Sequence, residues 1–121
     1  MSTLNVSNIS DGTTSVGTGY VVNGSAKAWA RYDGSSSLIS SFNVSSLVDD
    51  ATAGNTTVSF TSNMASIDYL GVASANQSTG DIGDRFAAVS NFFVGSVDTF
   101  AFDGAARADV MTSVAVMGDL A

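Results

Sequence analysis

Apolar and polar residues alternate with a period of two through much of the segment 26–72, and this alternation constrains the fold most. The pattern is clearest in residues 26–33, where one face would carry Ala26, Ala28, Ala30 and Tyr32 and the other Lys27, Trp29, Arg31 and Asp33. Successive side chains of a β-strand point to opposite faces, whereas a helix repeats every 3.6 residues. The pattern therefore predicts a strand with one covered face.

Further short segments of the same kind follow along the chain. Turn-forming residues such as Asp33-Gly34 and Ser62-Asn63 separate them. The predicted strands are residues 38–44, 55–61, 67–72, 85–96, 97–103 and 110–117. With residues 3–9 as a first strand, about eight strands result. This rhythm predicts an all-β fold, an antiparallel, jelly-roll-like β-sandwich.

The charged residues also argue against helices. All 11 acidic residues are aspartate, and lysine and arginine together number 4. Helix surfaces are usually rich in Glu, Lys, Arg and Gln, which are scarce here. We expect one domain at 20–121, preceded at 1–19 by an extended N-terminal arm, or by a first strand plus linker.

Several segments resemble a known family. The order AKAW…YDG followed by SFNVSSLVDDATAGNTTVSFTSNMASIDYLGV, flanked by MSTLNVSNISDG and DVMTSVAVMGD, resembles the small β-rich C-terminal domain of phage tail-fibre and virion structural proteins, especially from marine and cyanobacterial phages. The resemblance implies a β-rich virion protein that forms trimers. Residues 73–103 look like an insertion relative to that family, and the chain has no fibrous shaft.

Charge and composition exclude several classes of partner. A net charge of −7 with four scattered basic residues does not suit nucleic acid, because phosphate contacts need clustered cations. The chain has no long apolar run, so we expect no membrane insertion. Without cysteine it has neither disulfides nor thiolate metal sites. We expect no cofactor, and a location in the virion after assembly in the host bacterial cytoplasm.

The residues available for catalysis are few. The chain has no His, Cys or Glu, the commonest general bases and nucleophiles besides Asp and Ser. Aspartate pairs such as Asp49/Asp50, Asp81/Asp84 and Asp103/Asp109 leave a polysaccharide depolymerase as one alternative. Aspartate in loops usually caps turns, so we predict a protein that is not an enzyme.

Two sets of residues are candidates for binding. The polar stretch 73–84 predicts an exposed loop with Asn76, Gln77, Asp81 and Asp84 as binding residues. Whether Asp81 and Asp84 bind calcium stays open. Candidates for docking on a partner are Leu4, Val6, Ile9, Trp29, Phe92, Phe93, Phe100 and Phe102. For Trp29 the alternatives are packing, a subunit contact and a sugar contact.

The resemblance implies a phage virion surface protein, and the scarcity of catalytic residues favours one that acts by protein–protein binding. The first reading is a capsid decoration (cement) or head-fibre protein, with the arm docked on the major capsid protein. The alternative is a tail-fibre tip that contacts tail proteins and the host surface, including a host-surface glycan. The absence of a coiled-coil or repeat shaft favours decoration. A homo-oligomer, most simply a trimer, is expected in either case.

Overall fold

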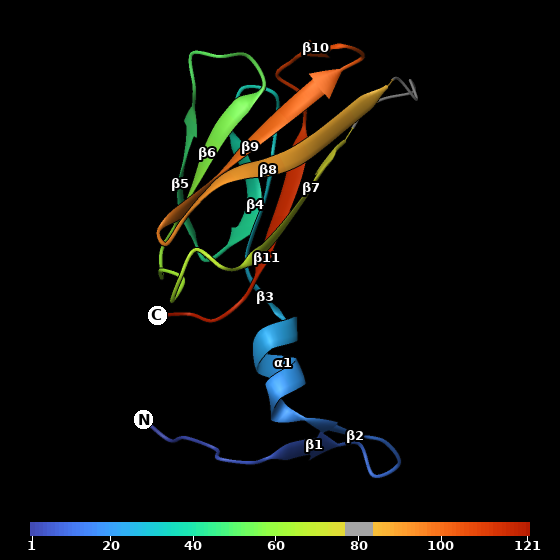
Figure 1. The fold of residues 1–121 in the computed structure, drawn as a ribbon, viewed down its shortest axis with the longest axis vertical. Coiled ribbons are helices and arrows are strands. Elements are labelled where there is room, and N and C mark those ends of the chain that lie inside the picture. The colour runs from blue at the N-terminus through green and yellow to red at the C-terminus, as the bar shows by residue number, and fades with distance from the viewer. Residues whose placement is uncertain (77–83) are drawn as a thin grey trace.

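Two antiparallel sheets pack face to face in the computed structural model, which describes residues 1–76 and 84–121 (Figure 1). Sheet I has the order β4-β3-β11-β7, with β3 (Ala26–Tyr32), β4 (Leu38–Phe42), β7 (Leu70–Ala75) and β11 (Thr112–Met117). Sheet II has β5, β6, β9 and β8 side by side, with bounds Val44–Asp49, Asn55–Phe60, Ser96–Asp103 and Arg85–Phe93. The predicted all-β sandwich is confirmed.

The first and last strands of the sandwich are neighbours at the centre of sheet I. β11 pairs with β3 on one side and with β7 on the other. In sheet II, β6 and β8 flank β9, and the short β10 (Ala106–Arg107) pairs with β9 beyond the end of β6. β7 begins later than the predicted 67–72 segment.

Asn43 passes the chain from one sheet to the other. Its backbone has φ 54°, a left-handed conformation that asparagine tolerates better than most residues. Its side-chain oxygen accepts a bond from the Ser62 N–H at 2.7 Å, and its amide donates to the Lys27 carbonyl oxygen at 3.0 Å. The predicted single strand 38–44 was wrong, because this corner divides the segment between β4 and β5.

The core lies between the central strands of the two sheets. On β3 the buried residues are Ala28, Ala30 and Tyr32, as the alternation predicted. The facing strands contribute Val58, Phe60, Val97 and Ala101, and β11 contributes Val114 and Val116. Burying such apolar surface stabilises the sandwich by about 25 cal/mol per Å² removed from water.

Hydroxyl groups occupy one end of this core. The Tyr32 hydroxyl lies 2.5 Å from Thr99 Oγ1, and Thr99 Oγ1 donates to the Thr56 carbonyl oxygen at 3.1 Å. Burial raises the pKa of Tyr32 above its ordinary value. Among the described residues, no buried side-chain nitrogen or oxygen lacks a hydrogen-bond partner, as a stable interior requires.

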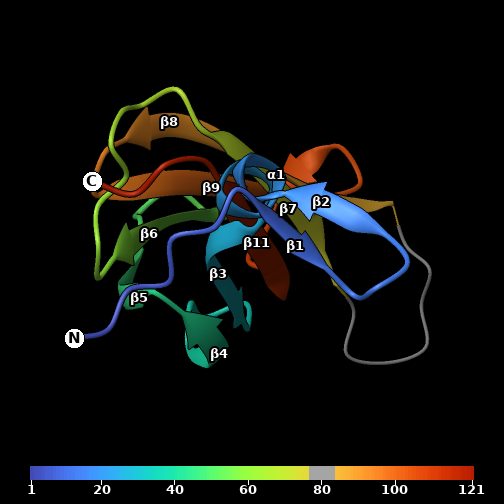
Figure 2. The ribbon, with the colours of Figure 1, turned by 90° about the horizontal axis from the view of Figure 1, so that it is seen from below.

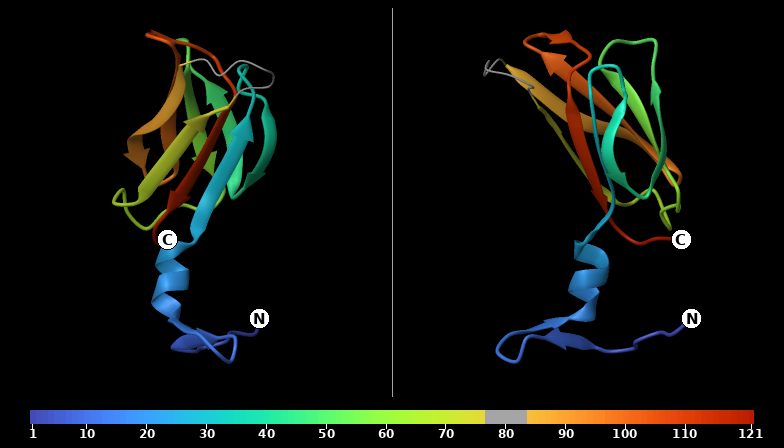
Figure 3. Two further views of the ribbon diagram at one scale, coloured as in Figure 1. Left: turned by 90° about the vertical axis from the view of Figure 1, so that its right-hand side faces the viewer. Right: turned by 180° about the vertical axis from the view of Figure 1, so that it is seen from behind.

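An N-terminal arm extends from one end of the sandwich (Figures 1 and 3). It consists of the hairpin of β1 (Asn8–Ser10) and β2 (Ser15–Gly17), followed by helix α1 (Thr18–Gly24). Seen from the arm's end, the hairpin crosses in front of the two layers (Figure 2). The sandwich therefore begins at Ala26 rather than at residue 20, and the strand expected at 3–9 is reduced to β1.

Substitution of Gly54 tests how the turn before β6 packs against Ala101 of β9 and against Ala108, which follows β10. Its φ is +77°, and a Cβ there would lie 2.4 Å from the Ala101 carbonyl oxygen. We expect Gly54→Ala to lower the free energy of unfolding by more than about 3 kcal/mol, because strain and a backbone clash add. Gly104, at φ +64° with open space around it, is the control, and Gly104→Ala should cost about 1 kcal/mol. Equal losses in urea unfolding would contradict this packing.

Candidate binding surfaces

The arm exposes apolar side chains that nothing in the described chain covers. Leu4 is 84% exposed and Tyr20 79%, and no residue of α1 is buried. The other exposed large apolar residues of the arm are Met1, Val6, Ile9, Val16, Val21 and Val22. The predicted docking residues Leu4, Val6 and Ile9 thus share one protruding element, to which the helix adds Tyr20, Val21 and Val22.

The helix in this arm has little stability of its own. It is 7 residues long, contains Gly19 and Gly24, and has no side-chain cap at its N-terminus. Isolated helices shorter than about 12 residues are marginal in water. At its C-terminal end, the Lys27 ammonium donates to the carbonyl oxygens of Val22 and Ser25. A hollow of about 540 Å³ lies beside it, lined in part by Tyr20 and Asn23.

An aromatic cluster lies on the outer face of sheet II. Phe86 of β8 stacks on Phe102 of β9 with ring centroids 4.7 Å apart, and Phe100 meets Phe102 edge to face at 5.8 Å. The Arg107 guanidinium lies 5.5 Å from the Phe100 ring centre and 5.8 Å from that of Phe102. Phe100 and Phe102 were predicted docking residues, whereas Phe86 and Arg107 were not. The latter two come beside Phe102 through strand pairing, which the sequence alone does not reveal.

Phe92 and Phe93 have different surroundings. Phe92 packs against the core, where its ring meets Tyr69 edge to face at 5.1 Å. Phe93 is 53% exposed at the end of β8. The Tyr69 hydroxyl lies 2.9 Å from the Phe93 carbonyl oxygen, and burial raises the pKa of Tyr69 to about 12. Of this pair, only Phe93 is available to a partner.

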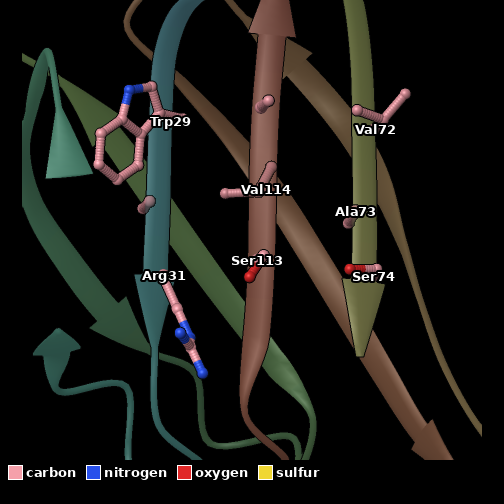
Figure 4. Close-up of a pocket in the computed structure, with 9 residues that line it drawn as sticks. Trp29, Arg31, Val72, Ala73, Ser74, Ser113 and Val114 are labelled. Carbon is pink, nitrogen blue, oxygen red and sulfur yellow. The ribbon is translucent and has the colours of Figure 1, made fainter. Parts of the chain in front are cut away.

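A shallow groove of about 460 Å³ crosses the outer face of sheet I (Figure 4). Its floor is formed by β11, whose outward residues Ser113 and Ala115 are small. Larger residues rise on both sides, Trp29 and Arg31 from β3 and Val72 from β7. Trp29, the only tryptophan in the chain, is 39% exposed here. The face of β3 that was predicted to carry Lys27, Trp29 and Arg31 is therefore the outer face of sheet I.

The strand register divides the groove into two rows. Trp29, Ala115 and Val72 pair across the three strands, and these residues are named here the apolar row. One step along, Arg31, Ser113 and Ser74 pair in the same way and form the polar row. Thus a ligand in the groove would meet apolar surface on one side and hydrogen-bonding groups on the other.

The predicted binding loop is described only at its two ends. The Asn76 amide donates to Ser113 Oγ at 2.8 Å, and the Asp84 carbonyl oxygen accepts from the Gly104 N–H at 2.9 Å. Both ends are thus fixed to neighbouring elements. Gln77 and Asp81 lie outside the described residues. Within the described part of the chain, no group of three or more Asp side chains is placed to hold a metal ion.

Aspartates of the described chain serve turns and strand pairs. Asp33 Oδ1 accepts bonds from the N–H groups of Ser37 and Ser35. These bonds lower the pKa of Asp33, and the bond from Ser37 has the largest effect. Asp103 pairs with Arg85 at 2.9 Å, and Asp109 accepts from the Gly54 N–H at 2.5 Å. The Asp103 and Asp109 carboxylates, one of the pairs considered for hydrolysis, thus have structural partners.

Comparison with known proteins adds no relative. No protein-family model matches the chain, and no curated protein or solved structure shows significant similarity to it. Among the described residues, no helix has the length and apolar character needed to cross a bilayer. The arm, the aromatic cluster and the groove are therefore the features that bear on function.

The arm should be dispensable for folding of the sandwich. Deletion of residues 1–24 removes no buried side chain, so we expect the free energy of unfolding to change by less than about 1 kcal/mol. Urea unfolding followed by circular dichroism measures it. A loss of several kcal/mol would mean that the arm packs on the sandwich in solution.

Proposed function

We propose that this chain is a phage virion surface protein, a capsid decoration or head-fibre protein that attaches by protein–protein binding through its N-terminal arm. The observation that carries the proposal is the uncovered apolar surface of residues 4–22. Apolar side chains that contact nothing in their own chain commonly mark an interaction site. The resemblance to phage virion proteins, carried by four segments of the sequence, supplies the identity of the particle.

The marginal helix supports a role in docking. A 7-residue helix without buried residues gains its stability from whatever it packs against. The proposal assigns that role to the major capsid protein and to the arms of sister copies. Three arms side by side would cover one another's Tyr20 and Val22, in agreement with the expected trimer.

Binding, rather than catalysis, is the assigned activity. The described aspartates with known partners hold turns and an ion pair, as Asp33, Asp103 and Asp109 do. The chain has no histidine, cysteine or glutamate to serve as another base. This chemistry supports a structural protein over a depolymerase.

The alternative is a tail-fibre tip, and one feature of the shape favours it. β7 ends and β8 begins at the end of the sandwich opposite the arm (Figures 1 and 3). With the arm docked, the ends of the 73–84 segment, at Asn76 and Asp84, would face away from the particle. A tip protein would use this end to contact the host.

Copy number separates the two roles, because decoration needs hundreds of copies and a fibre needs tens at most.

Particles that lack the protein give the direct test. Purified protein is added back, and bound copies are counted by quantitative gel analysis and located by electron microscopy. We expect Leu4→Asp with Ile9→Asp to reduce binding at least about tenfold, because a charge cannot enter an apolar contact without cost. The matched control is Val48→Asp, an exposed apolar residue of β5, which should bind normally.

Two results would overturn the proposal. One is full binding of the arm variant to the particle surface. The other is failure of the unaltered protein to bind any part of the particle.

Light scattering on the free protein tests the trimer. The measured mass should be three times that of one chain, and the arm variant should shift toward a monomer.

A further inference from the structure

The charge on sheet I differs in sign from that of the whole chain. The chain has 11 acidic and 4 basic residues, yet the four strands of sheet I contain no aspartate and include Lys27 and Arg31. Sheet II, in contrast, has Asp49 on β5 and Asp98 and Asp103 on β9, beside Arg85 on β8 and Arg107 on β10. The outer face of sheet I is thus locally cationic, in a protein that otherwise repels anions.

Arg31 is the cation of this face whose one hydrogen bond among the described residues is to a sulfur. Lys27 donates to carbonyl oxygens at the end of α1. Among the described residues, Arg31 has no carboxylate within ion-pair distance and donates only to the Met111 sulfur, at 3.3 Å. A thioether is a weak acceptor, and a guanidinium has five N–H donors arranged to match a carboxylate. Most of those donors therefore point toward solvent or a ligand.

The two rows of the groove match a ligand with two kinds of surface. Trp29 offers an aromatic face against which a flat apolar face can lie, and its ring lies on the side of β3 away from Ala115 (Figure 4). The polar row, with Arg31, Ser113 and Ser74, lies one register step away on the same strands. The volume of about 460 Å³ is within the range of small-molecule sites.

We propose that this groove binds a pyranose that carries a carboxylate, a sugar of the uronic acid type. The C–H face of the ring packs on Trp29, and the carboxylate accepts bonds from Arg31. Hydroxyl groups of the sugar bond with Ser113 and Ser74. This site is independent of the arm, so it exists whether or not the proposed function is correct.

Two other occupants fit the groove less well. A peptide strand cannot add to the sheet here, because β3 and β11 are central and already paired on both sides. A second copy that presented its own sheet I would bring no aspartate of those strands to pair with Arg31. An anionic ligand supplies that partner.

The only tryptophan of the chain lines the groove, so its fluorescence reports occupancy directly. The full-length protein is titrated with methyl β-D-glucuronide and, as the matched probe, methyl β-D-glucoside, which lacks the carboxylate. We expect a saturable change in Trp29 emission with the glucuronide, and binding of the glucoside weaker by at least about tenfold.

Variants assign the binding to the groove. Arg31→Gln should weaken glucuronide binding at least about tenfold and remove the preference over the glucoside. Arg107→Gln, which removes a cation from sheet II instead, should bind as the unaltered protein does. Ala115→Leu fills the floor and should abolish the response, and circular dichroism checks that each variant is folded.

Three outcomes would overturn the proposal: no saturable response to the glucuronide, equal affinities for the two sugars, or an unchanged affinity in Arg31→Gln. An emission that shifts with protein concentration in the absence of sugar would also overturn it, because a second copy would then cover Trp29.

Discussion

The structure depends on a thin interior filled mainly by small side chains. Where the sheets face each other, alanine, valine and threonine occupy most buried positions, as Ala28, Val58, Val97 and Val114 show. Tyr32 and Phe60 lie at the ends of their strands. Trp29, Phe42 and Phe86 are exposed instead, and are therefore available to partners.

The same constraint separates folding from binding. The sandwich buries one face of each sheet and satisfies its buried polar groups among the described residues, so it needs nothing from the arm. The arm has no core, and its apolar side chains gain nothing until another molecule covers them. We therefore propose separate roles for the two parts. The sandwich folds without the arm and carries the exposed binding surfaces, and the arm, which has little stability of its own, attaches the protein to the particle.

Sequence reasoning succeeded where local alternation decides the structure. The faces of β3 follow directly from the side-chain period, because this strand has one buried face. It failed at Asn43, where an apolar pattern continues across a corner between sheets, and at residues 18–24, where a short apolar run formed a helix. The groove was not predictable, since Trp29, Ala115 and Val72 meet only through the pairing of distant strands. Asn43 itself was the available signal for the corner, because asparagine adopts positive φ more readily than most residues.

Hydrogen exchange compared between the free protein and the protein on its particle tests the central claim most directly. The account predicts slow exchange in β3, β6, β9 and β11 in both states, since these strands hold the shared core. It predicts fast exchange in α1 of the free protein, and protection of α1 once the protein is bound. Protection of α1 in a free monomer, or its continued fast exchange on the particle, would contradict the claim that the arm waits for a partner.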